Sequence, residues 1–227
     1  FAENMLAAKP FLIYFCTMSA NKINVLFVTS WYPTKVKPTD GNFVQKHAEA
    51  VSLYANVDVL HVAFDRSLKK NFEYLKENRN TLTTHIIYLS YPGISFIKFI
   101  KYIRAYFYGY KQIYGKSGKP HVIHANILIP VGFIAFLLHL AKKIPYVITE
   151  HWTAYHPEDP TRIGKKLFWY KCFAKKSSRI IPVTGHLKIA MQSSGMRGHY
   201  SVVPNVVNTT LFSPGSHRVE AVKHIIH

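Results

Sequence analysis

Short apolar runs alternate along the chain with longer segments in which apolar residues recur at helical spacing. The first run, 23–29, is rich in β-branched residues, too short for a globular helix and too continuously apolar for a half-exposed strand. It therefore predicts a buried parallel strand. A long turn containing two prolines and Gly41 follows, and a helical pattern begins at Phe43. Because ligands of open α/β sheets bind beyond the carboxyl ends of the strands, this turn is a candidate binding loop.

The rest of the chain repeats this alternation. Apolar runs predict further strands at 57–62, 85–89, 121–126, 145–151, 179–184 and 200–203. Helical patterns lie at 95–119, 129–143, 162–176 and 185–194, and the polar, Lys-rich passage 65–84 is expected to be a loop with a short helix. Strands that alternate with helices predict an α/β fold with a doubly wound, mostly parallel sheet.

The segment 95–119 predicts an amphipathic helix with an aromatic, apolar face. Its opposite face carries the basic residues Lys98, Lys101, Arg104 and Lys111. Two interpretations remain open. The apolar face can pack on the sheet, as in an ordinary surface helix, or the helix can lie at a membrane interface, where basic and aromatic residues commonly occur side by side.

The charge balance indicates an anionic partner. The 227 residues include 29 Lys and Arg against 11 Asp and Glu, a formal net charge of +18. Nucleic acid, an acidic membrane surface and phosphorylated ligands all fit this charge. The two cysteines, Cys16 and Cys172, are far apart, which favours a reducing compartment, with the cytoplasm as the default. The first 21 residues contain one apolar patch, too short to span a bilayer, and are expected to be an extension outside the fold.

Sequence motifs exclude several kinds of site. The chain has no GxGxxG, GxxxxGK[ST], GxSxG or HExxH motif, so a dinucleotide fingerprint, a P-loop and a protein-built metal site are not predicted. Polar residues instead end the predicted parallel strands, and they should converge on one rim. They are Ser30, the Gly41–Asn42 loop, His124 with Asn126, Glu150 with His151, and Thr184. Histidine and asparagine suit sugar hydroxyls and phosphate oxygens, although a single histidine at a strand end is more often a cap or a satisfied core residue than a catalyst.

The order of these motifs resembles the N-terminal half of a family 4 retaining glycosyltransferase. The resemblance rests on DGNF after the first strand, HAN and TEH at later strand ends, and above all VPNVVN followed by FSP at 203–214. It covers the chain from Ile23 onward. It implies a glycosyltransferase-B (GT-B) fold, in which two Rossmann-like domains with helices on both sheet faces border a cleft.

The resemblance also implies a domain organisation. Residues 22–203 would form the N-terminal, acceptor-side domain, 204–221 the interdomain linker, and 222–227 the start of a nucleotide-sugar-binding domain. In that family the donor is held mainly by the second domain. We therefore expect this chain to be inactive when isolated.

By resemblance, roles can be assigned residue by residue. His151 would be catalytic, close to the transferred sugar. The donor diphosphate or sugar would contact Gly41, Asn42, Thr184 and Asn205, although Asn205 after Pro204 could equally be a turn former. The acceptor cleft would be lined by Ser30, His124, Asn126 and Glu150.

The implied reaction needs no metal or other cofactor, because the nucleotide-sugar is a substrate. Retention would proceed by front-face attack without a protein nucleophile, so backbone N–H groups and positive groups would stabilise the leaving diphosphate. No pair of carboxylates is placed for two-carboxylate glycoside chemistry.

The sequence thus predicts a cytoplasmic glycosyltransferase, peripheral on the inner face of the plasma membrane and active in polysaccharide or lipopolysaccharide assembly. Its partners would be a nucleotide-sugar, a glycan or lipid-linked acceptor and an anionic membrane surface. Two alternatives are a basic nucleic-acid-binding protein and a non-catalytic sugar- or lipid-binding module. The nucleic-acid alternative is disfavoured, because the aromatic residues fall on apolar helix faces rather than along exposed strands.

Overall fold

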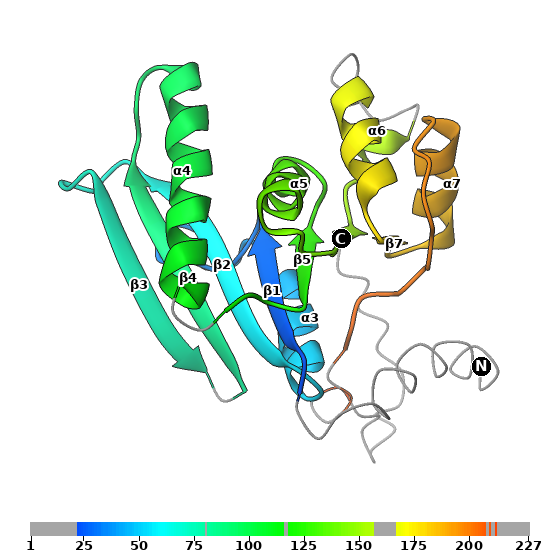
Figure 1. Cartoon of the computed structure of the whole chain (residues 1–227), viewed down its shortest axis with the longest axis horizontal. Helices are drawn as coiled ribbons and strands as arrows, with labels where there is room; N and C mark the ends of the chain where they lie inside the picture. The colour runs from blue at the N-terminus through cyan, green and yellow to red at the C-terminus, as the bar shows by residue number, and fades with distance from the viewer. Residues whose placement is uncertain are drawn as a thin grey trace, which may run out of the picture.

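A sheet of seven strands forms the centre of the described chain (Figure 1). The computed structural model describes residues 22–79, 81–115, 118–156, 167–207, 209 and 212. The strands are β1 (Asn24–Thr29), β2 (Asn56–Asp65), β3 (Phe72–Arg79), β4 (Leu82–Ser90), β5 (Val122–Asn126), β6 (Tyr146–Glu150) and β7 (Arg179–Pro182). The helices are α3 (Asn42–Ser52), α4 (Ser95–Tyr114), α5 (Val131–Lys142), the 3₁₀ helix η1 (Thr153–Tyr155), α6 (Leu167–Lys176) and α7 (Gly185–Ser193).

The strand order, β3-β4-β2-β1-β5-β6-β7, is that of a doubly wound sheet. The chain moves outward from β1 through β2 to β4, returns to β5 beside β1, and moves outward again through β6 to β7. These strands are mutually parallel, and β3 alone among the described strands is antiparallel to its neighbour. The predicted fold class is therefore confirmed, and the direction of winding reverses between β1 and β5, where ligands of such sheets bind.

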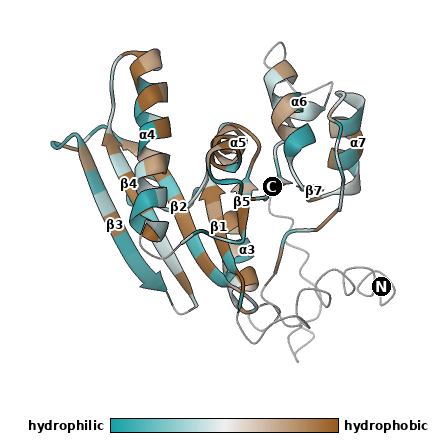
Figure 2. Cartoon of the chain, in the orientation of Figure 1, coloured by the Kyte–Doolittle hydropathy of each residue, from teal (hydrophilic) through white to brown (hydrophobic). Residues whose placement is uncertain are grey.

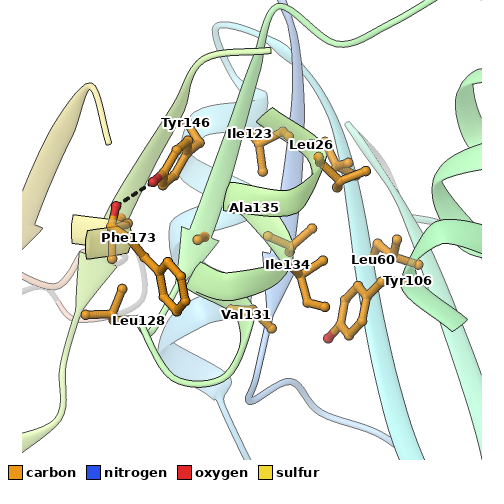
Figure 3. Close-up of a cluster of buried hydrophobic side chains, with 14 of the residues drawn as sticks. Leu26, Leu60, Tyr106, Ile123, Leu128, Val131, Ile134, Ala135, Tyr146 and Phe173 are labelled. Carbon is orange, nitrogen blue, oxygen red and sulfur yellow. Dashed lines mark hydrogen bonds between the residues drawn. The ribbon is translucent and has the colours of Figure 1, made fainter. Parts of the chain in front are cut away.

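Apolar side chains cover both faces of the sheet. Alternate residues of β1 point to opposite sides, so that Phe27 packs with α3 and Leu26 packs with α4 and α5. The larger cluster lies under α4 and α5 and includes a hydrogen bond from the Tyr146 hydroxyl to the Phe173 carbonyl (Figure 3). Hydropathy follows this plan, because the central elements β1, β5 and α5 are mostly apolar whereas the edge strand β3 is largely hydrophilic (Figure 2).

Two sequence predictions are wrong in detail. Residues 72–79 form the edge strand β3 instead of a loop or short helix. Charged residues such as Glu73 and Lys76 hide its alternation, and charges on an edge strand also discourage pairing with another chain. Residues 200–203 form one isolated bridge, between Tyr200 and Ile180, with further backbone bonds to β7, instead of a full strand.

The helix α4 packs on the sheet along only part of its length. Tyr106 and Tyr110 are buried, and Gly109 lets the helix approach β2, because a Cβ there would lie 2.4 Å from Leu60 Cδ1. Phe96 and Phe99, in the first turns, are 70% and 48% exposed. This end of α4 extends beyond the carboxyl ends of the neighbouring strands (Figure 1), so its apolar face is not wholly used in the fold.

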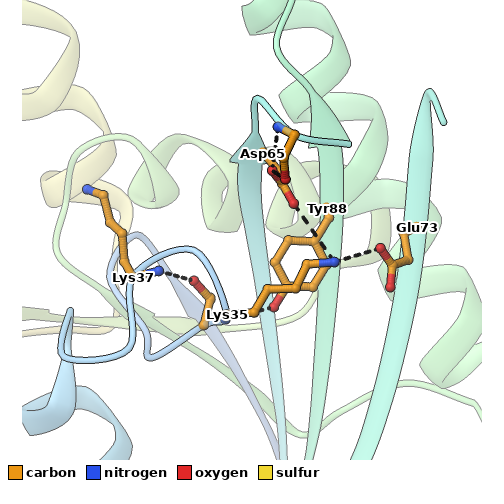
Figure 4. A network of polar contacts seen from close by, with 7 residues as sticks. Lys35, Lys37, Asp65, Glu73 and Tyr88 are labelled. Carbon is orange, nitrogen blue, oxygen red and sulfur yellow. Dashed lines mark hydrogen bonds and ion pairs between the residues drawn. The ribbon is translucent and has the colours of Figure 1, made fainter. Parts of the chain in front are cut away.

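The loop between β1 and α3 is tied to three strands through Lys35 (Figure 4). The Lys35 ammonium lies 2.8 Å from Glu73 Oε2, 3.8 Å from Asp65 Oδ2 and 4.2 Å from the centre of the Tyr88 ring. The backbone N–H of Lys35 also donates to the Tyr88 hydroxyl. These contacts hold the first half of the candidate binding loop against β2, β3 and β4.

Some predicted features lie outside the described residues. These are the extension 1–21, most of the linker 204–221 and the segment 222–227, so the predicted domain boundaries stay predictions. Among the described helices, none has the length and hydropathy needed to cross a bilayer.

Candidate functional site

A row of buried polar side chains crosses four strands near their carboxyl ends. The strand register aligns His61 of β2 with Thr29 of β1, Thr29 with Asn126 of β5, and Asn126 with Thr149 of β6. All four are at most 5% exposed and lie on the face covered by α3. His61 Nδ1 donates to the Thr29 carbonyl at 2.9 Å, and burial lowers the His61 pKa to about 4. This row lies at the reversal between β1 and β5, so it forms the floor of the expected site.

The imidazole of His124 belongs to the same strand as Asn126, two residues earlier in β5. Its Nε2 is 2.6 Å from the Thr149 hydroxyl, and its ring packs 4.4 Å from that of Phe27. Burial, together with a smaller effect of nearby His47 and His151, lowers the His124 pKa to about 3. The side chain is therefore neutral at physiological pH.

The imidazole of His151 is held mainly by ring packing. It contacts Phe43 at a centroid distance of 4.4 Å and meets His47 edge-on at 5.6 Å, both from α3. Burial, together with a smaller effect of nearby His47, lowers the His151 pKa to about 4. Because His47 and His124 also have lowered pKa values, the cluster consists of three uncharged imidazoles.

Two buried polar atoms of this site lack a partner among the described residues. They are Nε2 of His151 and Oδ1 of Asn126. Asn126 is fully buried, and its amide nitrogen makes only a long bond of 3.5 Å to the His124 carbonyl. Unpaired buried polar atoms cost free energy, and they occur mainly where a ligand or water completes them. A neutral imidazole and an amide oxygen suit the hydroxyl groups of a sugar.

The Glu150 carboxylate organises the two loops around the site. It has no exposed surface, and it accepts hydrogen bonds at 2.9 Å from the backbone N–H groups of Leu128, His151 and Trp152 and from the Tyr155 hydroxyl. Burial raises its pKa, and these four bonds act in the opposite direction. The predicted contact between Glu150 and an acceptor is not supported by this position, because both carboxylate oxygens are bound inside the fold.

Ile127 shows that the loop after β5 is strained. Its φ of 73° is unusual for a β-branched residue, and such conformations cost about 1–3 kcal/mol. The backbone N–H of Ile127 donates to the Thr149 carbonyl, and the next N–H binds Glu150. The two bonds hold Ile127 in this conformation, directly beside Asn126.

Gly41 has a structural explanation that the sequence did not reveal. Its φ is 70°, and a Cβ there would lie 2.4 Å from the Trp31 carbonyl carbon. Glycine is thus required by the close approach of two chain segments. The exposed Asn42 begins α3 next to it, so the predicted diphosphate contacts of Gly41 and Asn42 stay predictions.

The remaining predicted residues are dispersed. The Ser30 hydroxyl donates to the Ile129 carbonyl beside Asn126, so Ser30 belongs to the site rim. Asn205 reaches His47, at 3.1 Å. Thr184 caps α7 through a bond from the Leu187 N–H and has no contact with the histidine cluster.

The four basic residues predicted to contact a membrane differ in their surroundings. Lys98 lies 5.0 Å from the Phe64 ring centre and 4.8 Å from that of Tyr91, and Lys101 reaches the Ser90 hydroxyl. Arg104 and Lys111 are exposed. The structure therefore leaves two of the four free to meet a surface, and their membrane contact stays a prediction.

The sequence analysis missed Phe43 and His47. Both lie on the apolar stripe of α3, where packing is the ordinary role of a side chain. A histidine on an otherwise apolar helix stripe was the one sequence signal that could have pointed to His47. Only the fold shows that this stripe faces His151 at the end of β6. The described residues hold no group of three or more His, Cys, Asp or Glu side chains arranged for a metal ion.

Comparisons with known proteins place this geometry in a wider context. A model of Glycosyltransferase Family 4 matches residues 51–211, which is most of the chain. A search of curated proteins finds no match. A sucrose-phosphate synthase chain from Thermosynechococcus elongatus shares 16% identity at a TM-score of 0.55, over 83% of this chain and 92% of that chain.

Longer relatives show the same likeness over part of their length. A second structure of that synthase gives 14% identity and a TM-score of 0.59, over 86% of this chain and 51% of that chain. An Arabidopsis thaliana UGT complexed with UDP-L-rhamnose gives 12% identity and a TM-score of 0.50, over 84% and 50%. The chain thus spans about half the length of these two relatives. They share the GT-B fold, which confirms the fold expected from the sequence.

Glu150→Gln tests the carboxylate clamp. The amide retains one acceptor oxygen and turns an NH₂ group towards two of the four donors, so we expect a loss of about 2–4 kcal/mol in the free energy of unfolding. Urea denaturation measures it. Glu49→Gln, which removes an exposed ion pair with Lys46, is the matched control and should cost less than about 0.5 kcal/mol. Equal losses in the two variants would contradict the clamp.

The neutral histidines predict a pH dependence of stability. The pKa values of His61 and His151 are about 4 in the folded protein, against 6.5 when unfolded, so the unfolded chain binds more protons between these values. Stability should therefore fall as pH decreases from 6.5 to 4, by up to about 1.4 kcal/mol per pH unit for each such histidine.

Urea midpoints across this pH range measure the slope in the wild type and in His61→Gln. The variant should show a shallower slope, because it lacks one buried neutral imidazole. His186→Gln, at an exposed position of α7, should leave the slope unchanged. An identical slope in all three proteins would show that the histidine at position 61 is not neutralised by folding.

Proposed function

Because the chain belongs to Glycosyltransferase Family 4, we propose that it forms the acceptor-side lobe of an enzyme that transfers a sugar from a nucleotide-sugar, with retention, to a lipid-linked or polysaccharide acceptor. The site at the β1–β5 reversal is where the sugar binds. The nucleotide is assigned to a second lobe, so this chain alone is expected to give no transfer. The UDP-L-rhamnose in the Arabidopsis UGT supports a nucleotide-sugar as the donor class.

The observation that carries the proposal is the unpaired Nε2 of His151. It is buried, it belongs to a neutral imidazole, and its ring orientation is fixed by Phe43 and His47. A sugar hydroxyl would complete its hydrogen bonding, and Asn126 Oδ1 would accept a second hydroxyl. A neutral site of this kind positions the sugar through hydrogen bonds without attracting phosphate to the same point.

The surroundings of His151 fit a reaction without a protein nucleophile. Glu150, the adjacent carboxylate, accepts four hydrogen bonds, one of them from the His151 backbone N–H, and makes none with His151 Nε2. The chain's contribution is then to orient the transferred sugar, keep water from its reacting face and receive the acceptor. Developing positive charge on the sugar would meet neutral imidazoles, which repel it less than imidazolium would.

The surface around the start of α4 fits a lipid-linked acceptor. Ile94, Phe96 and Phe99 are 61%, 70% and 48% exposed, and Arg104 follows on the same helix. Exposed Phe168 and Trp169 lie on α6. Large exposed apolar groups beside basic residues suit insertion into an anionic lipid interface. We therefore assign the enzyme to the inner membrane surface, in polysaccharide or lipopolysaccharide assembly.

His151→Ala tests the assigned site. In the product of the complete gene, kcat/KM for donor hydrolysis or transfer should fall by about 100-fold, since one buried hydrogen-bond partner of the reacting sugar is lost. His186→Ala, an exposed histidine of α7, should keep wild-type kcat/KM. An unchanged kcat/KM in His151→Ala would show that His151 takes no part in the reaction and that the assignment of the site is wrong.

Flotation with lipid vesicles tests the membrane assignment. The wild-type chain should float with phosphatidylglycerol-containing vesicles and much less with phosphatidylcholine alone. Replacing Phe96 and Phe99 by serine should reduce flotation several-fold, because the inserted apolar area is lost. Leu53→Ser is the control, as Leu53 is 62% exposed directly after α3, away from α4 in the sequence. Binding that is equal for the two lipids, or unaffected by the double substitution, would contradict a docking surface on α4.

A further inference from the structure

The segment 201–207, which follows α7, returns to α3 and makes a specific contact there. Backbone bonds first tie it to β7, from Ser201 N–H to the Ile180 carbonyl and from Val203 N–H to the Pro182 carbonyl. It then runs towards α3 (Figure 1), where His47 Nε2 lies 3.1 Å from Asn205 Oδ1. The amide oxygen accepts, so the His47 Nε2–H donates. Asn205 is exposed while His47 is only 6% exposed, so the contact joins a surface segment to a buried ring.

The same ring contacts His151. His47 and Phe43 are one helical turn apart on α3, and both pack on the His151 imidazole, His47 edge-on at 87° and Phe43 tilted at 46°. Nε2 of His151 has no hydrogen-bond partner among the described residues. Packing by these two rings therefore largely decides where that nitrogen points.

Asn205 selects the state of His47. Burial keeps the His47 imidazole neutral by lowering its pKa, so only one ring nitrogen carries a proton. The bond to Asn205 places that proton on Nε2 and leaves Nδ1 as an acceptor. If the bond is lost, the tautomer and the ring orientation are no longer fixed, and the surface that packs on His151 changes with them.

We propose that His47 is a positioning residue that couples the 201–207 segment to His151, through its bond to Asn205 on one side and its ring contact on the other. The inference rests on the proposed function for the role of His151. In that function the segment leads towards the donor-side lobe, so a shift of the segment would change how the transferred sugar is held.

Imidazole NMR signals of this chain test the coupling directly. Asn205→Ala and His47→Phe should each shift the His151 Cε1–H signal, and the double variant should shift it no further than His47→Phe alone, because both remove one pathway. His47→Gln, which keeps an N–H donor near the Nε2 position but has no ring to pack on His151, should also shift the signal. Asn78→Ala, which removes an exposed side-chain bond between Asn78 of β3 and Thr83 of β4, is the control and should leave His151 unchanged.

Two results would overturn the inference. One is an unshifted His151 signal in Asn205→Ala, a variant at an exposed position that should fold normally. The other is additive shifts in the double variant, which would mean that the two residues act on His151 separately.

Activity separates this inference from the proposed function. In the product of the complete gene, Asn205→Ala should lower kcat by about 10-fold with KM changed less than 2-fold, since ring placement and not ground-state binding is altered. If no sugar transfer is found for the wild type while the NMR coupling is present, the proposed function fails and the coupling stands. Transfer that is unaffected by Asn205→Ala overturns the coupling and leaves the proposed function intact.

Discussion

The buried Glu150 carboxylate is the interaction on which the strand-end site depends. A charge without exposed surface is costly unless it is fully hydrogen-bonded, and here two loops supply four donors. The loop after β5 is thereby held with Ile127 at a strained φ, and the backbone of His151 is fixed by the same group. One side chain thus sets the relative position of Asn126 and His151, the two residues with unpaired buried atoms.

The parts of the fold predicted correctly are those whose burial is uniform. The strand β1 has apolar residues on both faces, with Leu26 in one cluster and Phe27 in the other, so its continuous apolar run revealed it. The strand β3 is an edge, and its exposed charged residues look like a loop. At the start of α4, an apolar stripe suggested burial but the residues are exposed. The sequence does not show whether the sheet is long enough to cover such a stripe.

The candidate site was predictable as a location and not as a mechanism. That polar strand ends would meet follows from a parallel sheet alone, so His124, Asn126 and His151 could be grouped from the sequence. Glu150 and His151 are adjacent residues with opposite roles, and the sequence could not predict this difference. The roles depend on which loop donors reach each side chain. His47 was hidden for a related reason. A histidine on a helix stripe looks like core, and its value comes from contacts with residues 104 and 158 positions later in the chain.

The distribution of charge separates two kinds of recognition. Near the site, Lys35, Lys37 and Lys46 are paired with carboxylates, and the histidine cluster is neutral. The site itself therefore contributes little to the net charge of +18. Arg104 and Lys111 of α4 have no ion pair among the described residues and stand beside exposed aromatic groups. Under the proposed function, an anionic surface would be attracted to the outside of the molecule and a polar, uncharged ligand would bind at the strand ends, so the two would not compete for the same groups.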